Sequence, residues 1–250
     1  MLKNEREREI LNLLKERDGF VSVHELCETL FASESSIRRD LAVLEKRGIV
    51  KRNYGGAELI TSYSNVVDFS HRTHYRVAEK RAIAKKAASL IKDGSIVFLD
   101  QTSTTFYLAE EIKNNHTLTV VTNSIEILGI MSGTGVKTVS SGGILCADNR
   151  VCLVGADAHA TFEKIYADMA FFSAKSLSGD GVISDCSLEE VQVRRAMMGN
   201  ARKRIFLCDS EKFNTQSGYK LCSLSEVDYL ISDSDSAHEW EKYGDGLIVM

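Results

Sequence analysis

From Arg76 onward, short apolar segments alternate with amphipathic segments of helical length, and this alternation limits the folds open to the chain. Strands separated by helices are typical of a parallel, doubly wound sheet with helices on both faces. We therefore predict a Rossmann-like, mostly parallel α/β domain over residues 76–250. The apolar segments that we assign to strands are 95–99, 117–121, 136–140, 168–172, 204–208 and 228–232.

The first 57 residues follow a different pattern, with three short helical segments and then a hairpin. Ser33 is a suitable N-cap for the third helix, and Gly48 a suitable residue to close it. Three helices and a hairpin make a winged helix-turn-helix. Apolar spacing predicts the helices at 4–17, 24–31 and about 33–47. The hairpin is predicted from strands at 49–52 and 57–60 around a turn at 53–56.

The two patterns are separated by a stretch without periodicity. Residues 61–75 are rich in Ser, Asn, Thr and His. We therefore divide the chain into a winged helix-turn-helix at 1–57, a linker at 58–75 and an α/β domain at 76–250.

Positive charge gathers in one part of a chain that is acidic overall. The formal net charge is −4, which by itself argues against a nucleic-acid-binding protein. Residues 33–57, however, hold six basic and three acidic side chains. A local basic patch on an acidic body is typical of a protein with a small DNA-contacting end.

The predicted third helix separates an apolar stripe from a polar face. Ile37, Leu41 and Leu44 lie within about 40° of one direction on a helical wheel, and we expect them to be buried. Small, hydroxyl and basic side chains elsewhere on the helix suit contact with base edges and phosphates, although the charges alone fit a solvated helix equally well. The wing adds two cations and a narrow Gly-Gly turn. The predicted DNA-contacting residues are Ser35, Ser36, Arg38, Arg39, Lys46, Lys51, Arg52, Gly55 and Gly56.

Polar residues follow several predicted strands at the points where those strands end. Asp100 ends the first apolar strand, and the hydroxyl run Thr102–Thr105 begins the next helix. A helix N-terminus offers unpaired N–H groups to a phosphate, but such a run by itself is more often a helix cap, and only several polar motifs at strand ends together favour a ligand site. Further polar residues follow other strands, and the carboxyl ends of parallel strands share one edge, where ligands bind. These further residues are Asn123, Ser124, Gly142, Gly143 and Asp209.

Longer motifs resemble a known family. The segment Ser33–Glu45 (SESSIRRDLAVLE), with the Gly-Gly-Ala of the wing after it, closely resembles the DNA-binding signature of the DeoR family of bacterial transcription regulators. Ser36 stands where threonine is usual and keeps the hydroxyl. The second domain resembles the sensor domain of the same family in the blocks 79–84, 99–105, 121–124, 141–143 and 209–213.

The resemblance implies a sequence-specific regulator, a repressor of a sugar-metabolism operon, controlled by a phosphorylated sugar. The sensor domain is similar to sugar-phosphate isomerases of the ribose-5-phosphate type. Asp100 would then accept a hydrogen bond from a sugar hydroxyl, and Lys212 would offer a cation. Thr102 stands where the family often has glycine, so its Cβ crowds that turn. The predicted effector-binding residues are Asp100, Thr102, Ser103, Thr104, Thr105, Asn123, Ser124, Gly142, Gly143, Lys175, Asp209 and Lys212.

An alternative is a sugar-phosphate isomerase with an added DNA-binding module. Isomerisation needs a carboxylate base to move a proton between neighbouring carbons. The isomerase pattern carries an acidic block after a central strand, whereas the comparable segment here, 172–176 (FSAKS), contains no acid. Binding groups are present without proton-transfer groups. We therefore predict a sensor with no catalytic residues.

The remaining expectations concern partners, location and cofactors. Double-stranded operator DNA usually presents repeated half-sites to such regulators, so we expect a homo-oligomer, a dimer or a tetramer. No apolar run reaches the roughly 18 residues of a membrane span, and no secretion signal follows the charged N-terminus, so we expect a cytoplasmic protein. The six cysteines lack C-x-x-C or zinc-finger spacing, so we expect no metal and no other cofactor.

Overall fold

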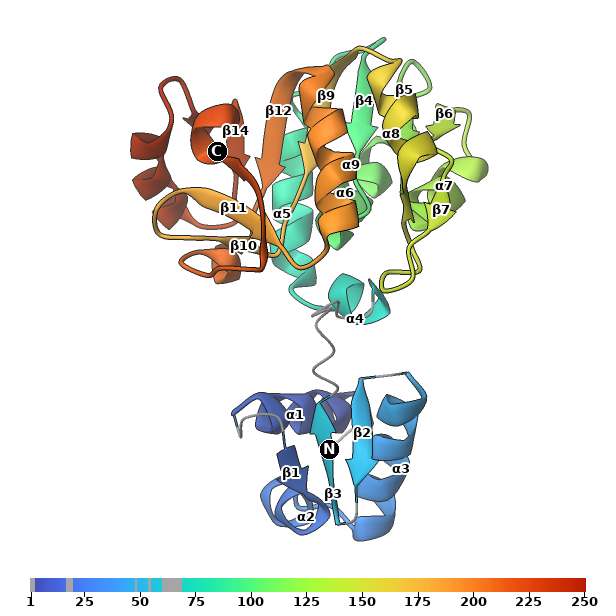
Figure 1. The fold of residues 1–250 in the computed structure, drawn as a ribbon, viewed down its shortest axis with the longest axis vertical. Coiled ribbons are helices and arrows are strands. Elements are labelled where there is room, and N and C mark those ends of the chain that lie inside the picture. Colours follow the sequence, from blue (N-terminus) through green and yellow to red (C-terminus); the bar gives the residue numbers. More distant parts are fainter. Residues whose placement is uncertain (1–2, 17–19, 48, 54, 60–68) are drawn as a thin grey trace. The chain divides into compact units, whose positions relative to one another are not determined.

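The computed structural model describes residues 3–16, 20–47, 49–53, 55–59 and 69–250. The chain forms two compact units, Met1–Val67 and Asp68–Met250, and each is described by itself (Figure 1). Three sequence predictions fall outside the described residues: the closing role of Gly48, the turn position Tyr54 and the 60–68 part of the linker.

The N-terminal unit is a winged helix-turn-helix, as predicted. Ser22 and Ser33 cap the second and third helices, because each side chain accepts a hydrogen bond from a backbone N–H three residues later. The strands form a sheet in the order β1-β3-β2, so the wing is extended by a strand that the sequence indicated only as a short extended piece. The elements are α1 (Lys3–Glu16), β1 (Phe20–Ser22), α2 (Val23–Leu30), α3 (Glu34–Lys46), β2 (Val50–Asn53) and β3 (Gly56–Leu59).

The second unit is built on a seven-stranded parallel sheet in the order β15-β14-β12-β9-β4-β5-β6. This confirms the predicted Rossmann-like α/β class. The chain runs outward from β4 through β5 to β6, then returns to β9 on the other side of β4, so the order reverses between β4 and β9. Its strands are β4 (Ile96–Leu99), β5 (Thr119–Thr122), β6 (Lys137–Ser140), β9 (Ala167–Phe172), β12 (Ala201–Leu207), β14 (Tyr229–Ile231) and β15 (Ile248–Val249).

Helices cover both faces of this sheet (Figure 1). On one face α5, α6 and α7 pack on alternate strand residues such as Val97 and Leu99, and on the other α8 and α9 pack on Phe98. Apolar side chains therefore point to both sides of a central strand, which explains its unbroken hydrophobic run. The helices are α5 (Val77–Ala88), α6 (Ser103–Ile112), α7 (Ile125–Ser132), α8 (Ala156–Glu163) and α9 (Leu188–Gly199).

Several shorter elements were missed at the sequence level. A three-stranded antiparallel sheet has the order β10-β11-β13 and packs against Phe172 and Phe206, and β7 pairs with β8 in a small hairpin. These strands are too short to show a clear alternation of apolar and polar residues. They are β7 (Ile144–Leu145), β8 (Leu153–Val154), β10 (Ser176–Leu177), β11 (Val182–Asp185) and β13 (Tyr219–Ser223); 3-10 helices occupy Ser210–Lys212, Leu224–Glu226 and Asp235–Tyr243.

The predicted linker contains a helix, α4 (Phe69–His74), that belongs to the second unit. Phe69 is buried with its ring edge-on to Phe106, at 5.7 Å between centroids. The Tyr107 hydroxyl donates to the Thr73 carbonyl at 2.7 Å. The second unit thus begins before residue 76.

Candidate functional site

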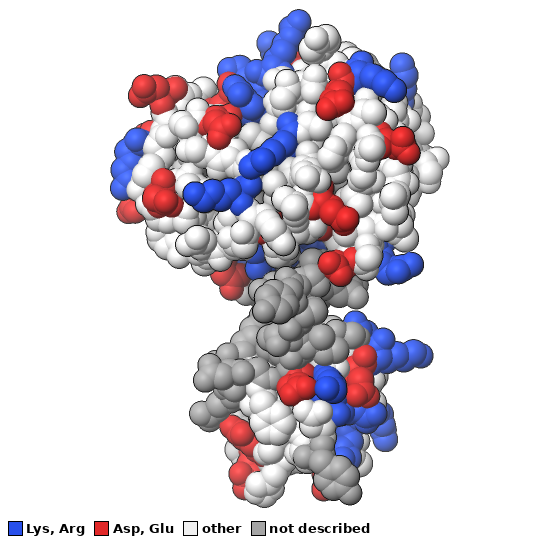
Figure 2. Space-filling view, viewed as in Figure 1, with Lys and Arg blue, Asp and Glu red and all other residues white. Residues whose placement is uncertain are grey.

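In the N-terminal unit, α3 separates a buried stripe from an open face, as its sequence predicted. Ile37, Leu41 and Leu44 are buried in the core of the unit. Ser35 and Arg39 lie on the exposed side. In Figure 2, Lys and Arg side chains gather over the α3 and β2 side of this unit, with acidic side chains among them.

Ion pairs to α1 hold α3 in place. The Arg6 guanidinium contacts the buried Asp40 carboxylate at 2.6 Å, and Arg47 contacts Glu7 at 2.9 Å. One contact at the middle of α3 and one at its C-cap hold the helix against α1. Sequence reasoning did not identify these pairs, since their members lie 34 and 40 residues apart.

The predicted DNA-contacting cations differ in whether they already have acidic partners. Arg38 pairs with Glu34 at 2.7 Å, Arg52 with Glu45 at 2.6 Å, and Lys51 with Glu58 at 3.7 Å. Hydrogen bonds from the Arg52 backbone and side chain hold the pKa of the Glu45 carboxyl below its ordinary value. Within the described part of the chain, two predicted cations form no ion pair or side-chain hydrogen bond. They are Arg39 and Lys46.

The two glycines of the wing serve different purposes. Gly55 is exposed and has a positive φ of 90°, which an L side chain rarely adopts. Gly56 is buried, and a Cβ there would lie 2.6 Å from both the Phe20 ring and the Val21 carbonyl. Gly56 thus allows β3 to approach β1, and its role in the structure is packing within the sheet.

In the second unit, Asp100 ends β4 and is fully buried. Its Oδ1 accepts hydrogen bonds from the Thr102 N–H and hydroxyl and from the Thr105 hydroxyl, at 2.7–3.0 Å. Its Oδ2 accepts from the Ser173 N–H at 3.0 Å and from Arg194 at 2.9 Å. Because Ser173 ends β9, Asp100 joins the two strands between which the sheet order reverses. Both carboxylate oxygens of Asp100 therefore already accept hydrogen bonds from other residues of the protein.

Arg194 is the centre of a buried charge network that sequence reasoning missed. Its guanidinium contacts Asp100 and Asp185 at 2.9 Å and Glu190 at 3.2 Å. Burial lowers the pKa of the guanidinium, but the three carboxylates outweigh that effect and raise it, so Arg194 is charged. The available signal was its place on the buried stripe of α9, four residues after Glu190.

Some predicted ligand residues are helix caps, the alternative that the hydroxyl run had left open. The Thr102 side chain accepts from the Thr105 N–H and caps α6, and Ser124 accepts from the Ile127 N–H and caps α7. Ser103 is also buried, whereas Gly142, Gly143 and Lys175 are exposed.

Other polar atoms at the same edge have no hydrogen-bond partner. The Thr104 hydroxyl and the Asn123 Oδ1 are buried and unpaired, as is the Nε of Arg72. The Asn123 Nδ2 donates to Gln101 at 2.9 Å and to the Leu153 carbonyl at 3.1 Å, which fixes the orientation of the amide. Buried polar atoms are rarely left unpaired, so these atoms mark the place where a polar ligand would complete the structure.

Several cations of the second unit lie near Lys80: Lys212, Arg72 and Arg76. The buried Lys80 ammonium donates to the carbonyls of Arg72 and Tyr75. Burial, together with the nearby positive charge of Lys212, lowers the pKa of Lys80 to about 8. Burial raises the pKa of Asp209, but Lys212 at 3.2 Å and other cations outweigh that effect and lower it. Asp209 and Lys212, both predicted as effector-binding residues, thus form an ion pair with each other.

Lys80 was not predicted as a site residue, although its position gave a signal. It lies on the buried stripe of α5 with Ile83, Ala84 and Ala87, where an apolar residue is usual. Neither Lys80 nor Arg72 forms an ion pair within the described ranges, because their hydrogen-bond acceptors are neutral oxygens. The edge therefore has positive charge available for an anion.

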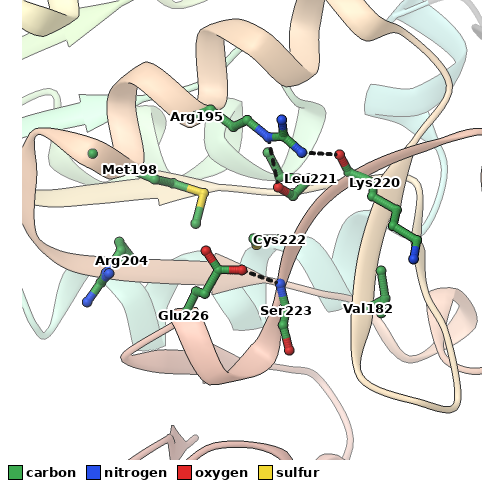
Figure 3. Close-up of a pocket in the computed structure, with 10 residues that line it drawn as sticks. Val182, Arg195, Met198, Arg204, Lys220, Leu221, Cys222, Ser223 and Glu226 are labelled. Atoms are coloured by element: carbon green, nitrogen blue, oxygen red, sulfur yellow. Dashed lines mark hydrogen bonds between the residues drawn. The ribbon is translucent and has the colours of Figure 1, made fainter.

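A separate cavity of about 510 Å³ lies near the amino end of β12 and not at the carboxyl edge. Figure 3 shows Arg195 donating to the backbone of Lys220 and Leu221, and Glu226 accepting from the Ser223 N–H. These polar groups are already paired within the protein. We therefore place the candidate ligand site at the strand ends.

Comparison with known proteins agrees with both units. Residues 6–63 match the DeoR-like helix-turn-helix domain, and residues 75–234 match the DeoR C terminal sensor domain. The chain belongs to the DeoR family. Members of this family are transcriptional regulators, so the chain is a DNA-binding regulator and not an enzyme.

Two relatives span nearly the whole chain. A protein of Escherichia coli (strain K12), named as the uncharacterized HTH-type transcriptional regulator YgbI, is 34% identical and covers 93% of this chain and 91% of its own. A lactose phosphotransferase system repressor of Staphylococcus aureus (strain NCTC 8325 / PS 47) is 31% identical, with 96% of each chain covered.

A solved structure of ribose 5-phosphate isomerase A from Methanocaldococcus jannaschii is similar to part of the chain. It is 20% identical, covers 54% of this chain and 53% of its own, and has a TM-score of 0.40. We draw no conclusion from so partial a match. In the described ranges, no helix has both the length and the apolar character needed to span a membrane.

Proposed function

We propose that this DeoR-family regulator represses a sugar-metabolism operon and that a phosphorylated sugar bound at the carboxyl edge of its second unit controls it. The observation that carries the proposal is the unpaired Thr104 hydroxyl and Asn123 Oδ1, buried at the ends of neighbouring strands. A polyhydroxylated ligand supplies both a donor and an acceptor for such atoms. The relative named as a lactose phosphotransferase system repressor supports both repression and a sugar signal.

The charges at this edge support a phosphorylated ligand. Lys80 and Arg72 carry positive charge without an acidic partner among the described residues, and the first turn of α6 directs its N–H groups toward the same edge. Lys212 is partly exposed and donates to the Ser173 hydroxyl at 2.9 Å. A phosphate would give Lys80 and Arg72 an anionic acceptor in place of neutral oxygens, and hydrogen bonds between two charged groups are stronger.

The same contacts give a route from the ligand to the DNA-binding unit. α4 is the first described element after the wing, and Lys80 bonds to carbonyls at its C-terminal end. A phosphate that draws Lys80 or Arg72 toward itself weakens these bonds and changes how α4 is held. By linkage, the ligand alters DNA affinity only as far as its own affinity differs between the free and DNA-bound protein.

The decisive experiment is a thermal-shift screen of phosphorylated sugars on the full chain, with Thr104→Val as the test variant. The Thr104 hydroxyl has no partner in the protein, so its removal leaves the fold intact and removes only a ligand contact. A sugar at 100 times its dissociation constant stabilises the wild type by about 2.7 kcal/mol. We expect the shift to be reduced in Thr104→Val.

The matched control is Thr119→Val, which removes a hydroxyl at the opposite, amino end of β5. Its shift should equal that of the wild type. A sugar that stabilises both variants equally, or a complete screen without any stabilising sugar, would rule out the proposed site.

We propose in addition that the regulator binds DNA as a homo-oligomer. Repeated half-sites are best matched by a symmetric assembly. Sedimentation of the full chain and of residues 68–250 should give the same dimer or tetramer, and monomeric behaviour of either would contradict the proposal. A reporter gene behind the bound promoter should rise when the regulator is deleted, as repression requires.

A further inference from the structure

Two cysteines face each other at the base of the turn between β7 and β8. The hairpin ladder continues one step beyond these strands, where the Cys146 N–H donates to the Cys152 carbonyl at 2.9 Å. Both residues are buried, with 2% and 0% of their surface exposed. The turn between them holds Asn149, which is also buried.

Glu190, in the first turn of α9, brings a carboxylate to the two thiols. One of its oxygens and the two sulfurs all lie within 4.8 Å of one another. Its Oε1 accepts a hydrogen bond from Asn149 at 2.9 Å and keeps a second lone pair, while its Oε2 accepts from Gln101 and Arg194. Outer-shell partners orient metal-binding carboxylates in this way.

We propose that Cys146, Cys152 and Glu190 form a binding site for a thiophilic divalent cation, with Zn²⁺ as the expected ion. Thiolate and carboxylate are both zinc ligands, at about 2.3 Å and 2.0–2.2 Å, so the three atoms must draw together by about 1 Å. The Glu189 carboxylate lies 3.8 Å from the Cys146 sulfur on an exposed residue. It supplies a fourth ligand and a path from solvent.

Charge balance favours a divalent ion. A cysteine thiol ordinarily carries its proton at neutral pH, and a metal ion binds the thiolate. Binding breaks two S–H bonds, forms two metal–sulfur bonds and releases two protons to solvent. One divalent cation thus replaces two protons, and the net charge of the buried network is unchanged. Protonated thiols are also poor nucleophiles, which disfavours disulfide formation between them.

This site is distinct from the ligand edge but connected to it. Glu190 bonds to Gln101, which bonds to Asn123, and the Asn149 Oδ1 accepts from Arg72 on α4 at 3.2 Å. A bound cation would therefore stiffen the turn that α4 contacts. The proposal does not depend on the identity of the effector.

The test uses the full chain, reduced and freed of metal by a chelator, and titrated with Cd²⁺ as a spectroscopic probe for Zn²⁺. The thiolate-to-Cd²⁺ charge-transfer absorption should grow to saturation at one equivalent per chain. Cys146→Ala and Cys152→Ala should each remove it. The loss of affinity should exceed the about 10–100-fold expected for an outer-shell partner. Glu189→Gln should weaken binding without abolishing it.

The matched control is Cys222→Ala, which removes a buried thiol from a different core cluster and should leave the titration unchanged. Thermal unfolding without metal checks that each variant folds. If Cys152→Ala does not fold, the proposal is tested by Cys146→Ala and Glu189→Gln alone. The proposal is overturned if the wild type shows no saturable absorption or if both cysteine variants keep it. It is also overturned if the denatured wild-type chain yields fewer than its six free thiols, because Cys146 and Cys152 would then be a disulfide.

Discussion

Arg39 and Lys46 are the two cations of α3 that are exposed and unpaired in the described part of the chain, and Arg39 is the only arginine of the two. Its neighbour Arg38 is held by Glu34, so Arg38 must exchange an acidic partner before it contacts DNA. A free guanidinium opposite the buried Ile37 stripe is placed to read a guanine edge. This geometry supports base recognition by Arg39 more than by Arg38.

We predict that Arg39→Ala costs about 1–3 kcal/mol of binding free energy on the preferred sequence and leaves thermal stability unchanged, because no core contact is lost. Fluorescence anisotropy on fragments selected from a random DNA pool measures the change. Lys46→Ala is the control for a phosphate contact and should weaken all sequences alike. Wild-type specificity in Arg39→Ala would place the docking face elsewhere.

Lys80 makes ligand binding depend on pH. Its pKa of about 8 means that the free protein loses this charge as the pH rises above 8. A bound phosphate favours the charged form, so binding above pH 8 must take up a proton. The affinity for a phosphorylated sugar should therefore be steady just below pH 8 and fall by up to about tenfold per pH unit above it.

Calorimetric titrations between pH 7 and 10 test this prediction. Lys80→Met should bind more weakly and lose the decline above pH 8, while Lys85→Met, an exposed lysine on the same helix, should keep it. A wild-type affinity that does not change over this range would contradict a role for Lys80 at the site.

Asp100 shows how far a single residue can be interpreted from sequence. Its place at the end of a strand was predictable from the apolar run before it. Its partners were not, because Ser173 and Arg194 lie 73 and 94 residues away. The sequence prediction of a sugar contact stays untested, but in the structure both carboxylate oxygens of Asp100 accept hydrogen bonds from other parts of the protein. Thr104 is accordingly the better residue for testing the ligand.

At the scale of elements, α9 holds the network through Arg194. Removal of this guanidinium leaves three carboxylates buried together, and loss of one partner from a buried pair costs about 3–5 kcal/mol. We predict that Arg194→Met lowers the free energy of unfolding by about this amount, measured by urea denaturation.

The adjacent Arg195 provides the control for that experiment. It is partly exposed and donates to the carbonyls of Leu221 and Lys220. Arg195→Met should cost only about 1 kcal/mol, as for ordinary hydrogen bonds. Equal losses in the two variants would show that the charge network contributes nothing beyond local packing.

Elements were predictable where periodicity extends over several turns or strands. The predicted strand at 168–172 is observed at 167–172, and the wing strands and recognition helix agree within two residues. The sheet β10-β11-β13 was missed because β10 has only two residues and because β11 pairs with β13, which lies more than 30 residues later in the chain. Candidate-site residues at strand ends could be named from the sequence, whereas those that helices supply, such as Lys80 and Arg194, could not.

At the scale of the whole molecule, the structure changes where the second unit begins. Contacts of α4 with α6 bury Phe69 against Phe106 and satisfy the Tyr107 hydroxyl. The Lys80 ammonium of α5 bonds to the carbonyl of Arg72 on α4 and to that of Tyr75, just after α4. A fragment that starts at residue 76 loses all of these. Sequence composition alone could not show this, since a six-residue helix with hydroxyl or histidine side chains at four positions is too short for a hydrophobic period.

We therefore predict that residues 68–250 are more stable than residues 76–250 by roughly 2–4 kcal/mol, from the buried Phe69 side chain and the lost hydrogen bonds. Urea denaturation of both fragments measures the difference. Phe69→Ala in the longer fragment should lower its free energy of unfolding by about 2 kcal/mol, because the substitution removes the ring and keeps the backbone carbonyls. If the two fragments unfold at the same urea concentration, α4 does not contribute to the stability of the second unit. The proposal that the ligand acts on DNA binding through this helix would then be wrong.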